Sequence, residues 1–387
     1  MKILHLVPSI GPGSGGMGTA TLATFREQRQ AGIDSSIWCV DPPDVARAAA
    51  RSPEVFTMPV VGPRRFAFSP AGERRARRTA ADLSHQHGLW TAQARVTDIL
   101  RTRGIPTVLS PHGSLAPFAR RGSAWKKRLA LAWFESRNLR LASCLHATSE
   151  AEVSSFRDFG LRGPVAVIPH GVSPSWLTAA ADPARFRSAH GIGSGTRVML
   201  FLSRVHPIKG LPMLVEALAM ERDRLHDWCM VVAGPDAAGH RAAIEGLAER
   251  MEVSRLIRFV GPLFDSEKRD AFAAAEVFVL PTHTENFGIV IVEALACGVP
   301  VLTTRGAPWG ELEVHDCGWW VPIDSRSIAA GLAEAAGRSA EELRAMGARG
   351  RELVASCYLW PAIGNRTIGL YRWLLGQAER PDFVVVD

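Results

Sequence analysis

Short runs of apolar and β-branched residues alternate with helical patterns along the whole chain, and this alternation constrains the fold most. Strands that alternate with helices predict βα units, whose strands pair in parallel. No repeat of about 20–50 residues is visible, so we expect two doubly wound sheets rather than a repeat array. The predicted strands form two series: Lys2–Val7, Ser36–Val40, Asp82–His85, Thr107–Ser110, Cys144–Ala147 and Val165–Ile168, then Arg197–Leu202, Cys229–Ala233, Ile257–Val260, Val277–Leu280 and Val299–Thr303.

The stretch from Val172 to Thr196 is rich in Pro, Gly, Ser and Ala, which is typical of a boundary between domains. We therefore expect an N-terminal domain over residues 1–183, a second domain over 184–361 and a C-terminal helix and tail over 362–387. The predicted helices include Thr19–Gln30, Thr91–Arg103, Ser123–Leu141, Glu150–Phe159 and an amphipathic Trp360–Gly376.

Composition argues for a soluble globular protein, since 47% of the residues are hydrophobic and 21% are charged. The longest apolar stretch, Gly288–Leu302, contains Glu293 and Pro300 and is too short to span a membrane. The N-terminus has neither the apolar run nor the cleavage site of a signal peptide. The six cysteines form no Cys-x-x-Cys pair, and a reducing cytoplasm is the expected location.

Positive charge is concentrated in the first half of the chain. Residues 1–182 carry 23 Lys and Arg against 13 Asp and Glu, a net charge of +10, whereas the remainder has a net charge of −3. This distribution predicts an anionic partner for the first half, such as a membrane surface, although solvated helix faces would explain it equally well. The excess gathers in two groups: Arg64, Arg65, Arg74, Arg75, Arg77 and Arg78, then Arg120, Arg121, Lys126, Lys127 and Arg128.

A glycine-rich turn follows the first strand and opens the first helix, over residues 11–18. Glycines allow close approach of a ligand, and the free N–H groups of a helix start attract phosphate. The loop only partly matches a dinucleotide-binding fingerprint, with Asp41 as the one candidate for its acidic residue. A simple flexible turn is the alternative.

Two further motifs follow strands of the second half. Arg204 and Lys209 come directly after Arg197–Leu202, where two cations could clamp a diphosphate, with surface charge as the alternative. Only five of the 45 basic residues are lysines, which makes Lys209 unusual.

The motif that starts at Thr284 ends at Glu293 and leads into an apolar helix. If Glu285 and Glu293 both lay on this helix, they would be roughly 12 Å apart along its axis and could face one extended ligand. The amides between them would then meet phosphates. Because a buried glutamate needs a partner, a structural salt bridge at Glu293 remains an alternative.

Three histidines, His85, His87 and His112, also follow or end strands. No acidic residue or cysteine stands at ligand spacing from them, so we expect no bound metal ion. Near a site, a histidine suits hydrogen bonding or proton transfer, and each of the three could equally be structural.

Together, the glycine turn, Pro111-His112-Gly113, Arg204-x-x-x-x-Lys209 and Glu285-x-Phe287-Gly288 with Glu293 resemble retaining glycosyltransferases of family 4 over nearly the whole chain. The resemblance implies the GT-B fold: two Rossmann-like domains facing a cleft, with a last helix that crosses back to the first domain. It also implies that His112 and Glu285 are catalytic. Donor binding would fall to Gly15, Gly16, Arg204, Lys209, Asn286, Phe287, Gly288 and Glu293, and the acceptor side to His87 and Ser149.

Transfer of a sugar from a nucleotide sugar, with retention of configuration, is the activity that the resemblance implies. The expected acceptor is a glycan or a polyprenyl-diphosphate-linked molecule of surface polysaccharide or lipopolysaccharide synthesis. We expect no cofactor, no metal and no nucleic-acid partner, and a cytoplasmic enzyme that can associate peripherally with the membrane. His170 and Gly310 depart from the family pattern. A nucleotide-sugar 2-epimerase-like isomerase and a non-catalytic nucleotide-sugar-binding protein are the alternatives.

Overall fold

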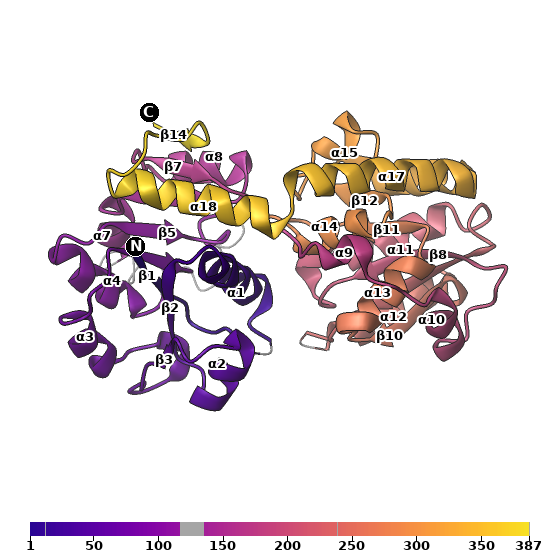
Figure 1. Ribbon diagram of the computed structural model, residues 1–387. Coiled ribbons are helices and arrows are strands. Elements are labelled where there is room, and N and C mark those ends of the chain that lie inside the picture. The colour runs from indigo at the N-terminus through magenta and orange to yellow at the C-terminus, as the bar shows by residue number, and fades with distance from the viewer. Residues whose placement is uncertain (12, 117–134, 238, 387) are drawn as a thin grey trace. The chain divides into compact units, whose positions relative to one another are not determined.

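The computed structural model describes residues 1–11, 13–116, 135–237 and 239–386. The chain divides into two compact units. The first contains residues 1–171 and returns with residues 360–387, and the second contains residues 172–359. Each unit is an α/β layer structure with its own parallel sheet (Figure 1). Two doubly wound domains are therefore confirmed.

The first unit has a sheet in the order β14-β7-β6-β5-β4-β1-β2-β3, parallel except for its last strand, β14. The chain reverses its direction of growth between β1 and β4, which is where ligands bind in open sheets of this kind. The strands are β1 (Lys2–Leu6), β2 (Asp34–Cys39), β3 (Val55–Thr57), β4 (Leu83–His87), β5 (Thr107–Ser110), β6 (Cys144–Ala147), β7 (Val165–Val167) and β14 (Val384–Val385).

Helices cover both faces of this sheet, as Figure 1 shows. The C-terminal helix α18 (Trp360–Leu374) packs against α1 (Gly15–Gln30) and buries Ile363, Leu370 and Tyr371. The expected return of the last helix to the first domain is thus confirmed. The other helices of the unit are α2 (Pro43–Ala50), η1 (Arg64–Phe66), α3 (Pro70–Ala76), α4 (Gln93–Thr102), α7 (Ser136–Arg140) and α8 (Glu150–Asp158).

The second unit has a fully parallel sheet in the order β10-β9-β8-β11-β12-β13, with its switch point between β8 and β11. Its strands are β8 (Arg197–Leu202), β9 (Trp228–Ala233), β10 (Ile257–Gly261), β11 (Val277–Leu280), β12 (Val301–Thr304) and β13 (Gly318–Val321). Its helices are α9 (Ser175–Thr178), α10 (Pro183–Ala189), η3 (Pro207–Lys209), α11 (Leu211–Met220), α12 (His240–Arg250), η4 (Ser254–Leu256), α13 (Asp265–Ala274), α14 (Ile289–Ala296), α15 (Glu311–Val314), α16 (Ser325–Gly337) and α17 (Ala340–Cys357).

The observed boundaries differ from the expected ones at residues 183/184 and 361/362. The second unit begins at Val172, because the segment after it packs on that unit: Arg185 pairs with the buried Asp270, and Arg351 donates to the carbonyl of Leu177. The return to the first unit begins at Trp360, whose side chain joins the core of the first unit.

Most of the predicted helix Ser123–Leu141 and the second basic group lie outside the described residues, and α7 is the part described. Among the helices of the described segments, none is both long and apolar enough to cross a membrane.

Candidate functional site

An ion pair between Lys209 and Glu285 lies at the carboxyl edge of the second sheet. Lys209 ends the short helix η3, which follows β8, and Glu285 lies in the loop that follows β11. Both side chains are largely buried, at 10% and 19% exposure. Residues 76 positions apart in the sequence are therefore brought together at the switch point of the sheet.

Close backbone packing holds the two loops together. Gly210 has φ +72°, and a Cβ on it would lie 1.8 Å from the carbonyl oxygen of Pro281. The hydroxyl of Thr282 donates to the carbonyl of Ile208 at 3.1 Å. Only glycine fits at position 210, and this close approach sets the reach of Lys209 toward Glu285.

Glu293 lies on α14 and forms an ion pair with Lys268 of α13. The side chain of Glu293 is 12% exposed, and burial raises its pKa while Lys268 opposes that change. The alternative considered for Glu293, a salt-bridge partner, is therefore present in the structure. Lys268 also lies 5.4 Å from the ring of Trp176.

The helix begins later than the sequence suggested. It starts at Ile289 after Gly288, which has φ +83°, so Glu285 lies in a loop and the distance along one helix axis does not apply. Phe287 is buried, and its carbonyl accepts from the indole of Trp309. Asn286 and Gly288 occupy the same loop, and the exposed Arg204 follows β8 two residues after its end.

The glycine-rich turn of the first unit is held by Asp41. Its carboxylate accepts from the hydroxyl of Ser9 at 2.8 Å and from the backbone N–H of Ile10 at 2.6 Å. Asp41 thus shapes the loop, which argues against a role as the acidic residue of a dinucleotide fingerprint. Gly15 and Gly16 form the first turn of α1 and are exposed.

His112 stands at the end of β5 with φ +49°, and its ring stacks between those of His87 and His170 at 5.4 Å on each side. Its Nε2 lies 3.2 Å from Nδ1 of His87. His87 is only 3% exposed, so it contacts His112 rather than solvent. The departure from the family pattern at His170 therefore falls directly beside His112.

Ser149 caps the N-terminus of α8. Glu152, in the first turn of that helix, accepts from the backbone N–H of Gly113 at 2.7 Å and of Thr148 at 2.9 Å. This carboxylate joins the segment of Ser149 to the residue that follows His112. His112 and Ser149 thus lie at the same edge of the first sheet.

A cluster of three buried histidines, His5, His85 and His87, has ring nitrogens within 4.8 Å of one another and is the best candidate for a metal site among the described residues. Each of their ring nitrogens already has a hydrogen-bond partner. A metal ion would have to displace several of these bonds, so the residues fit a hydrogen-bonded core better than a coordination site.

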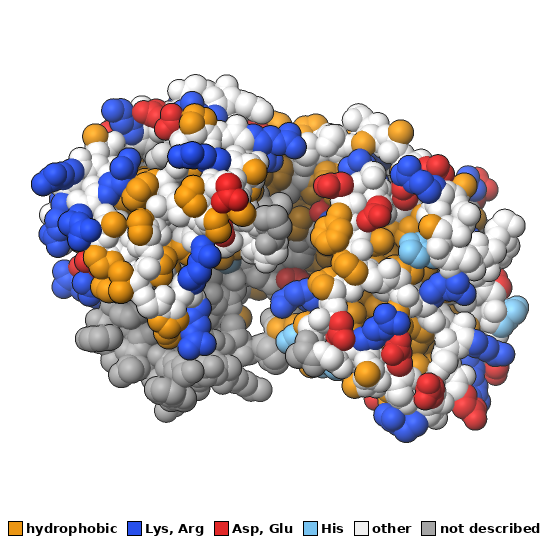
Figure 2. All heavy atoms as spheres, turned by 90° about the horizontal axis from the view of Figure 1, so that it is seen from below, with side chains coloured by type: hydrophobic (Ala, Val, Ile, Leu, Met, Phe, Trp, Pro, Cys, Tyr) orange, Lys and Arg blue, Asp and Glu red, His pale blue; other side chains and the backbone are white. Residues whose placement is uncertain are grey.

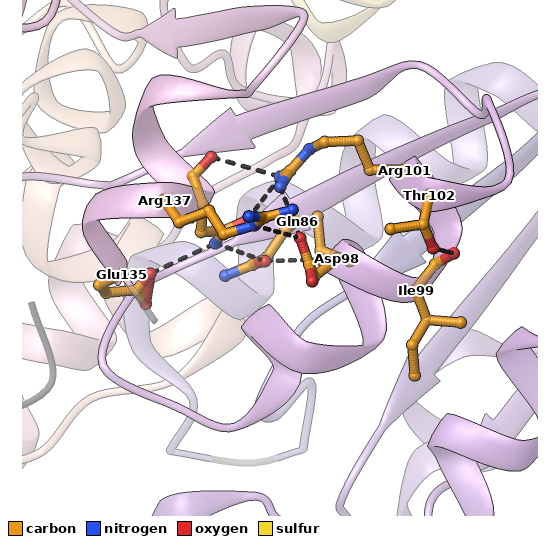
Figure 3. A network of polar contacts seen from close by, with 9 residues as sticks. Gln86, Asp98, Ile99, Arg101, Thr102, Glu135 and Arg137 are labelled. Atoms are coloured by element: carbon orange, nitrogen blue, oxygen red, sulfur yellow. Dashed lines mark hydrogen bonds and ion pairs between the residues drawn. The ribbon is translucent and has the colours of Figure 1, made fainter. Parts of the chain in front are cut away.

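Gln86, between two of these histidines, faces the opposite side of β4 and belongs to the polar network of Figure 3. Its Oε1 accepts from Thr97 at 2.6 Å and from Asn138 at 3.2 Å. Asn138 also donates to Glu135, which accepts from the backbone N–H of Trp90. Burial raises the pKa of Glu135 to about 7. This network anchors the turn after β4 and with it the position of His87.

Comparison with protein families gives matches in both units. The family described as "Glycosyl transferase 4-like domain" matches residues 15–171, and "Glycosyl transferases group 1" matches residues 182–353. The chain belongs to the glycosyltransferases, with a 4-like domain in the first unit and a group 1 domain in the second. The matched regions contain the candidate residues of both sheets, from Gly15 to Glu293.

A D-inositol 3-phosphate glycosyltransferase from Kineococcus radiotolerans is 30% identical over 263 residues, which cover 62% of this chain and 59% of that protein. The match therefore spans less than two thirds of the relative's length. This relative is a glycosyltransferase, which agrees with the family assignment.

Solved structures confirm the GT-B fold. Sucrose-phosphate synthase from Thermosynechococcus elongatus matches with a TM-score of 0.81 and 23% identity, covering 98% of this chain and 100% of that one. HepE of Anabaena in complex with UDP-glucose matches with a TM-score of 0.76 and 21% identity, covering 95% and 98%.

Several residues of these sites escaped the sequence analysis. His5, His146 and Tyr371 carry no motif, and only strand register and the return of α18 bring them near His87. Lys268 lies on a helix whose pattern gave no hint of a partner for Glu293. The rarity of lysine in this chain was a usable signal, since both lysines of the second unit pair with the two predicted glutamates.

Proposed function

We propose that the chain transfers a sugar from a nucleoside-diphosphate sugar to a glycan or polyprenyl-diphosphate-linked acceptor, with retention of configuration. The observation that carries this proposal is the Lys209–Glu285 pair at the switch point of the second sheet, beside the start of α14. A cation next to a carboxylate matches a donor that presents both phosphate and sugar hydroxyls.

The chemistry follows from the charges. The bond between the anomeric carbon and the diphosphate oxygen breaks, so negative charge grows on the diphosphate. Lys209, the exposed Arg204 and the N–H groups at the start of α14 are suited to stabilise that charge. Glu285 would hold sugar hydroxyls, and Glu293 the ribose. A diphosphate oxygen would take the acceptor proton as the new bond forms on the same face.

The donor class has support from a structural neighbour, since HepE of Anabaena has been solved with UDP-glucose. A thermal-shift comparison of UDP, GDP and their sugars tests the donor site, because a ligand that binds only the folded protein raises its melting temperature.

Acceptor-dependent release of nucleotide tests the reaction itself. A transferase releases nucleotide only with an acceptor, an epimerase yields an isomerised donor without one, and a binding protein does neither. Turnover of the donor to its epimer, or binding without any turnover across a panel of lipid-linked and free glycans, would contradict the proposal.

The acceptor is proposed to be anionic and associated with a membrane because of a group of basic residues on η1, on α3 and directly after α3: Arg64, Arg65, Arg74, Arg75, Arg77 and Arg78. All six of these arginines are exposed, and the exposed apolar side chains of Val61 and Phe66 lie beside them in the chain. Figure 2 shows Lys and Arg side chains interspersed with hydrophobic ones on this unit. Such a mixture is typical of surfaces that bind anionic lipid.

Co-sedimentation with vesicles tests this basic group. We expect binding to anionic vesicles that weakens with salt, since each basic residue near the surface contributes on the order of 1 kcal/mol. The charge-reversing substitutions Arg74→Glu and Arg77→Glu should reduce binding to the vesicles. The same substitutions at Arg222 and Arg224 of the second unit should not. Equal binding to neutral vesicles, or none at low salt, would favour a soluble acceptor.

A further inference from the structure

A continuous chain of hydrogen bonds runs through the first unit and begins at a backbone carbonyl. Nε2 of His146 lies 2.7 Å from the carbonyl oxygen of Ile168, and Nδ1 of His146 lies 2.7 Å from the hydroxyl of Ser110. The same hydroxyl lies 2.6 Å from Nε2 of His85, whose Nδ1 lies 2.6 Å from the hydroxyl of Tyr371. Four side chains from β5, β6, β4 and α18 are joined in this first half.

The second half continues from Tyr371 to His112. Nε2 of Gln28 lies 3.5 Å from the hydroxyl of Tyr371, and Oε1 of Gln28 lies 2.8 Å from Nε2 of His5. Nδ1 of His5 lies 3.0 Å from Nε2 of His87, whose Nδ1 lies 3.2 Å from Nε2 of His112. We call the whole series, from Ile168 to His112, the histidine chain.

The carbonyl of Ile168 sets the direction of the first half because a carbonyl can only accept. His146 must therefore donate from Nε2, and as a neutral imidazole it accepts at Nδ1. Ser110 has a single proton, which it gives to His146, so His85 must donate from Nε2 to Ser110. Burial lowers the pKa of His146 to about 4 and that of His85 below its usual range, so both are neutral at pH 7.

Donors and acceptors are fixed in the same way in the second half. Tyr371 donates to His85 and accepts from the amide of Gln28, which leaves the carbonyl oxygen of Gln28 facing His5. Ser35 donates to that oxygen as well, at 2.6 Å. His5 then donates from Nε2 and accepts at Nδ1. His87 therefore donates from Nε2 to His5 and accepts at Nδ1. His112, the last residue of the chain, donates from Nε2 to His87.

We propose that the histidine chain fixes His112 as the tautomer protonated on Nε2, so that its Nδ1 presents a lone pair and accepts from a substrate hydroxyl. Ser110, Tyr371 and Gln28 act as positioning residues. Nδ1 of His112 is shielded from solvent and has no hydrogen-bond partner among the residues that the structure describes. The role toward substrate rests on the proposed function, whereas the tautomer does not.

In the histidine chain, α18 has a role beyond packing. The hydroxyl of Tyr371 joins the two halves, so the C-terminal segment completes a hydrogen-bond chain that ends in Pro111-His112-Gly113. Without this hydroxyl, the side-chain amide of Gln28 can flip, so that its NH2 and carbonyl groups exchange places, with no hydrogen bond to Tyr371 to lose. A flipped amide would in turn favour the opposite tautomer of His5, then of His87 and then of His112.

Nitrogen NMR of the full-length protein, labelled with ¹⁵N at histidine and free of substrate, tests the tautomer. The His112 signals are assigned by their loss in His112→Gln. We expect a protonated Nε2 and an unprotonated Nδ1 at pH 7 in the wild type. In Tyr371→Phe and Ser110→Ala, each of which breaks the chain on a different element, we expect a mixture of both tautomers.

Tyr358→Phe is the matched control, since it removes the only other tyrosine hydroxyl, in the second unit, and should leave the His112 tautomer unchanged. A wild-type His112 protonated on Nδ1, or folded variants that both keep the wild-type tautomer, would overturn the proposal.

A kinetic measurement then separates this inference from the proposed function. In Tyr371→Phe we expect kcat to fall about tenfold with little change in the Kd of the nucleotide, the effect of one misdirected hydrogen bond. A simple loss of stability would instead lower the active fraction, which titration with nucleotide measures. Absence of transfer by the wild type would refute the proposed function and leave the tautomer result intact. Unchanged kcat despite a mixed tautomer would refute the role of His112 as an acceptor.

Discussion

Two lysine–glutamate pairs dominate the candidate donor site at the scale of single residues. Lys209–Glu285 and Lys268–Glu293 each join different elements of the second unit, and each side chain is at most 22% exposed. A ligand phosphate would share its lysine with a carboxylate that is already in place. In the proposed function, the pairs would keep the charged groups oriented before the donor binds, which would lower the cost of binding.

We expect Glu293→Gln and Lys209→Ala to leave the fold intact and to weaken nucleotide binding. A hydrogen bond to a charged group is worth about 1.5–3 kcal/mol, which corresponds to a loss of roughly ten- to a hundredfold in affinity. Calorimetric titration with the nucleotide measures this affinity. Glu249→Gln and Lys2→Ala, both exposed and outside the site, are the controls. Unchanged affinity in both site variants would mean that the donor binds elsewhere.

His112→Ala should lower turnover more than donor affinity. His112 belongs to the first unit, whereas the proposed nucleotide contacts, such as Lys209 and Glu293, belong to the second. Steady-state kcat and the Kd of the nucleotide, measured on the same preparation, separate the two effects. His315→Ala, an exposed histidine of the second unit, serves as the control. Losses of equal size in rate and affinity would contradict this division.

At the scale of elements, the sequence predicted what depends on local pattern. The strands Thr107–Ser110, Cys144–Ala147, Arg197–Leu202 and Val277–Leu280 were predicted with their observed bounds, because each is a short apolar run between turn residues. The strands β3, β13 and β14 were missed. They lie at or next to the sheet edges, and their few residues are ordered by neighbours rather than by their own pattern.

Gly210 gives a prediction about the link between two elements. Gly210→Ala would place a Cβ 1.8 Å from the carbonyl of Pro281, so η3 must move away from the loop after β11. Gly239→Ala is a matched control with nearly the same φ, +71° against +72°, and no atom within 4 Å of its Cβ. The control should cost about 1–2 kcal/mol for its left-handed backbone alone.

The Gly210 variant should cost clearly more than the control, and it should also weaken nucleotide binding through Lys209. Chemical denaturation of both variants measures the difference. Equal destabilisation would show that the loops can separate without cost and that their close approach does not position the ion pair.

For the whole molecule, the assembly of the polar sites could not be predicted from sequence. His87 and His112 were singled out one by one, but the link from His87 to His5 depends on the register of β1 against β4. Tyr371 lies more than 280 residues from His85 and reaches it only because the chain returns to the first unit. Such contacts follow from tertiary packing, which leaves no periodic trace in the sequence.

Histidine burial predicts how the two units respond to acid. All six histidines of the first unit have lowered pKa values because burial disfavours the charged form: His5 and His146 to about 4, His170 to about 3, and His85, His87 and His112 also below the usual value of 6.5. Below pH 6.5 the unfolded chain binds protons at these positions while the folded unit does not. The free energy of unfolding therefore falls as the pH drops from 6.5 toward 4, and no such loss occurs above 6.5.

For His5 and His146, whose pKa falls from 6.5 to about 4, this loss amounts to at most about 3 kcal/mol each. We expect the first unit to open before the second at pH 5, because the six buried histidines lie in the first unit, whereas His206 of the second unit, whose pKa is also lowered, is only partly buried. Hydrogen exchange at pH 7 and pH 5 measures the opening of each unit separately. We expect the backbone amides of β1, β4 and β5 to lose protection first. His146→Gln, whose amide can still donate to Ile168, should reduce the dependence on pH. Equal loss of protection in both units would show that the buried histidines do not control acid stability.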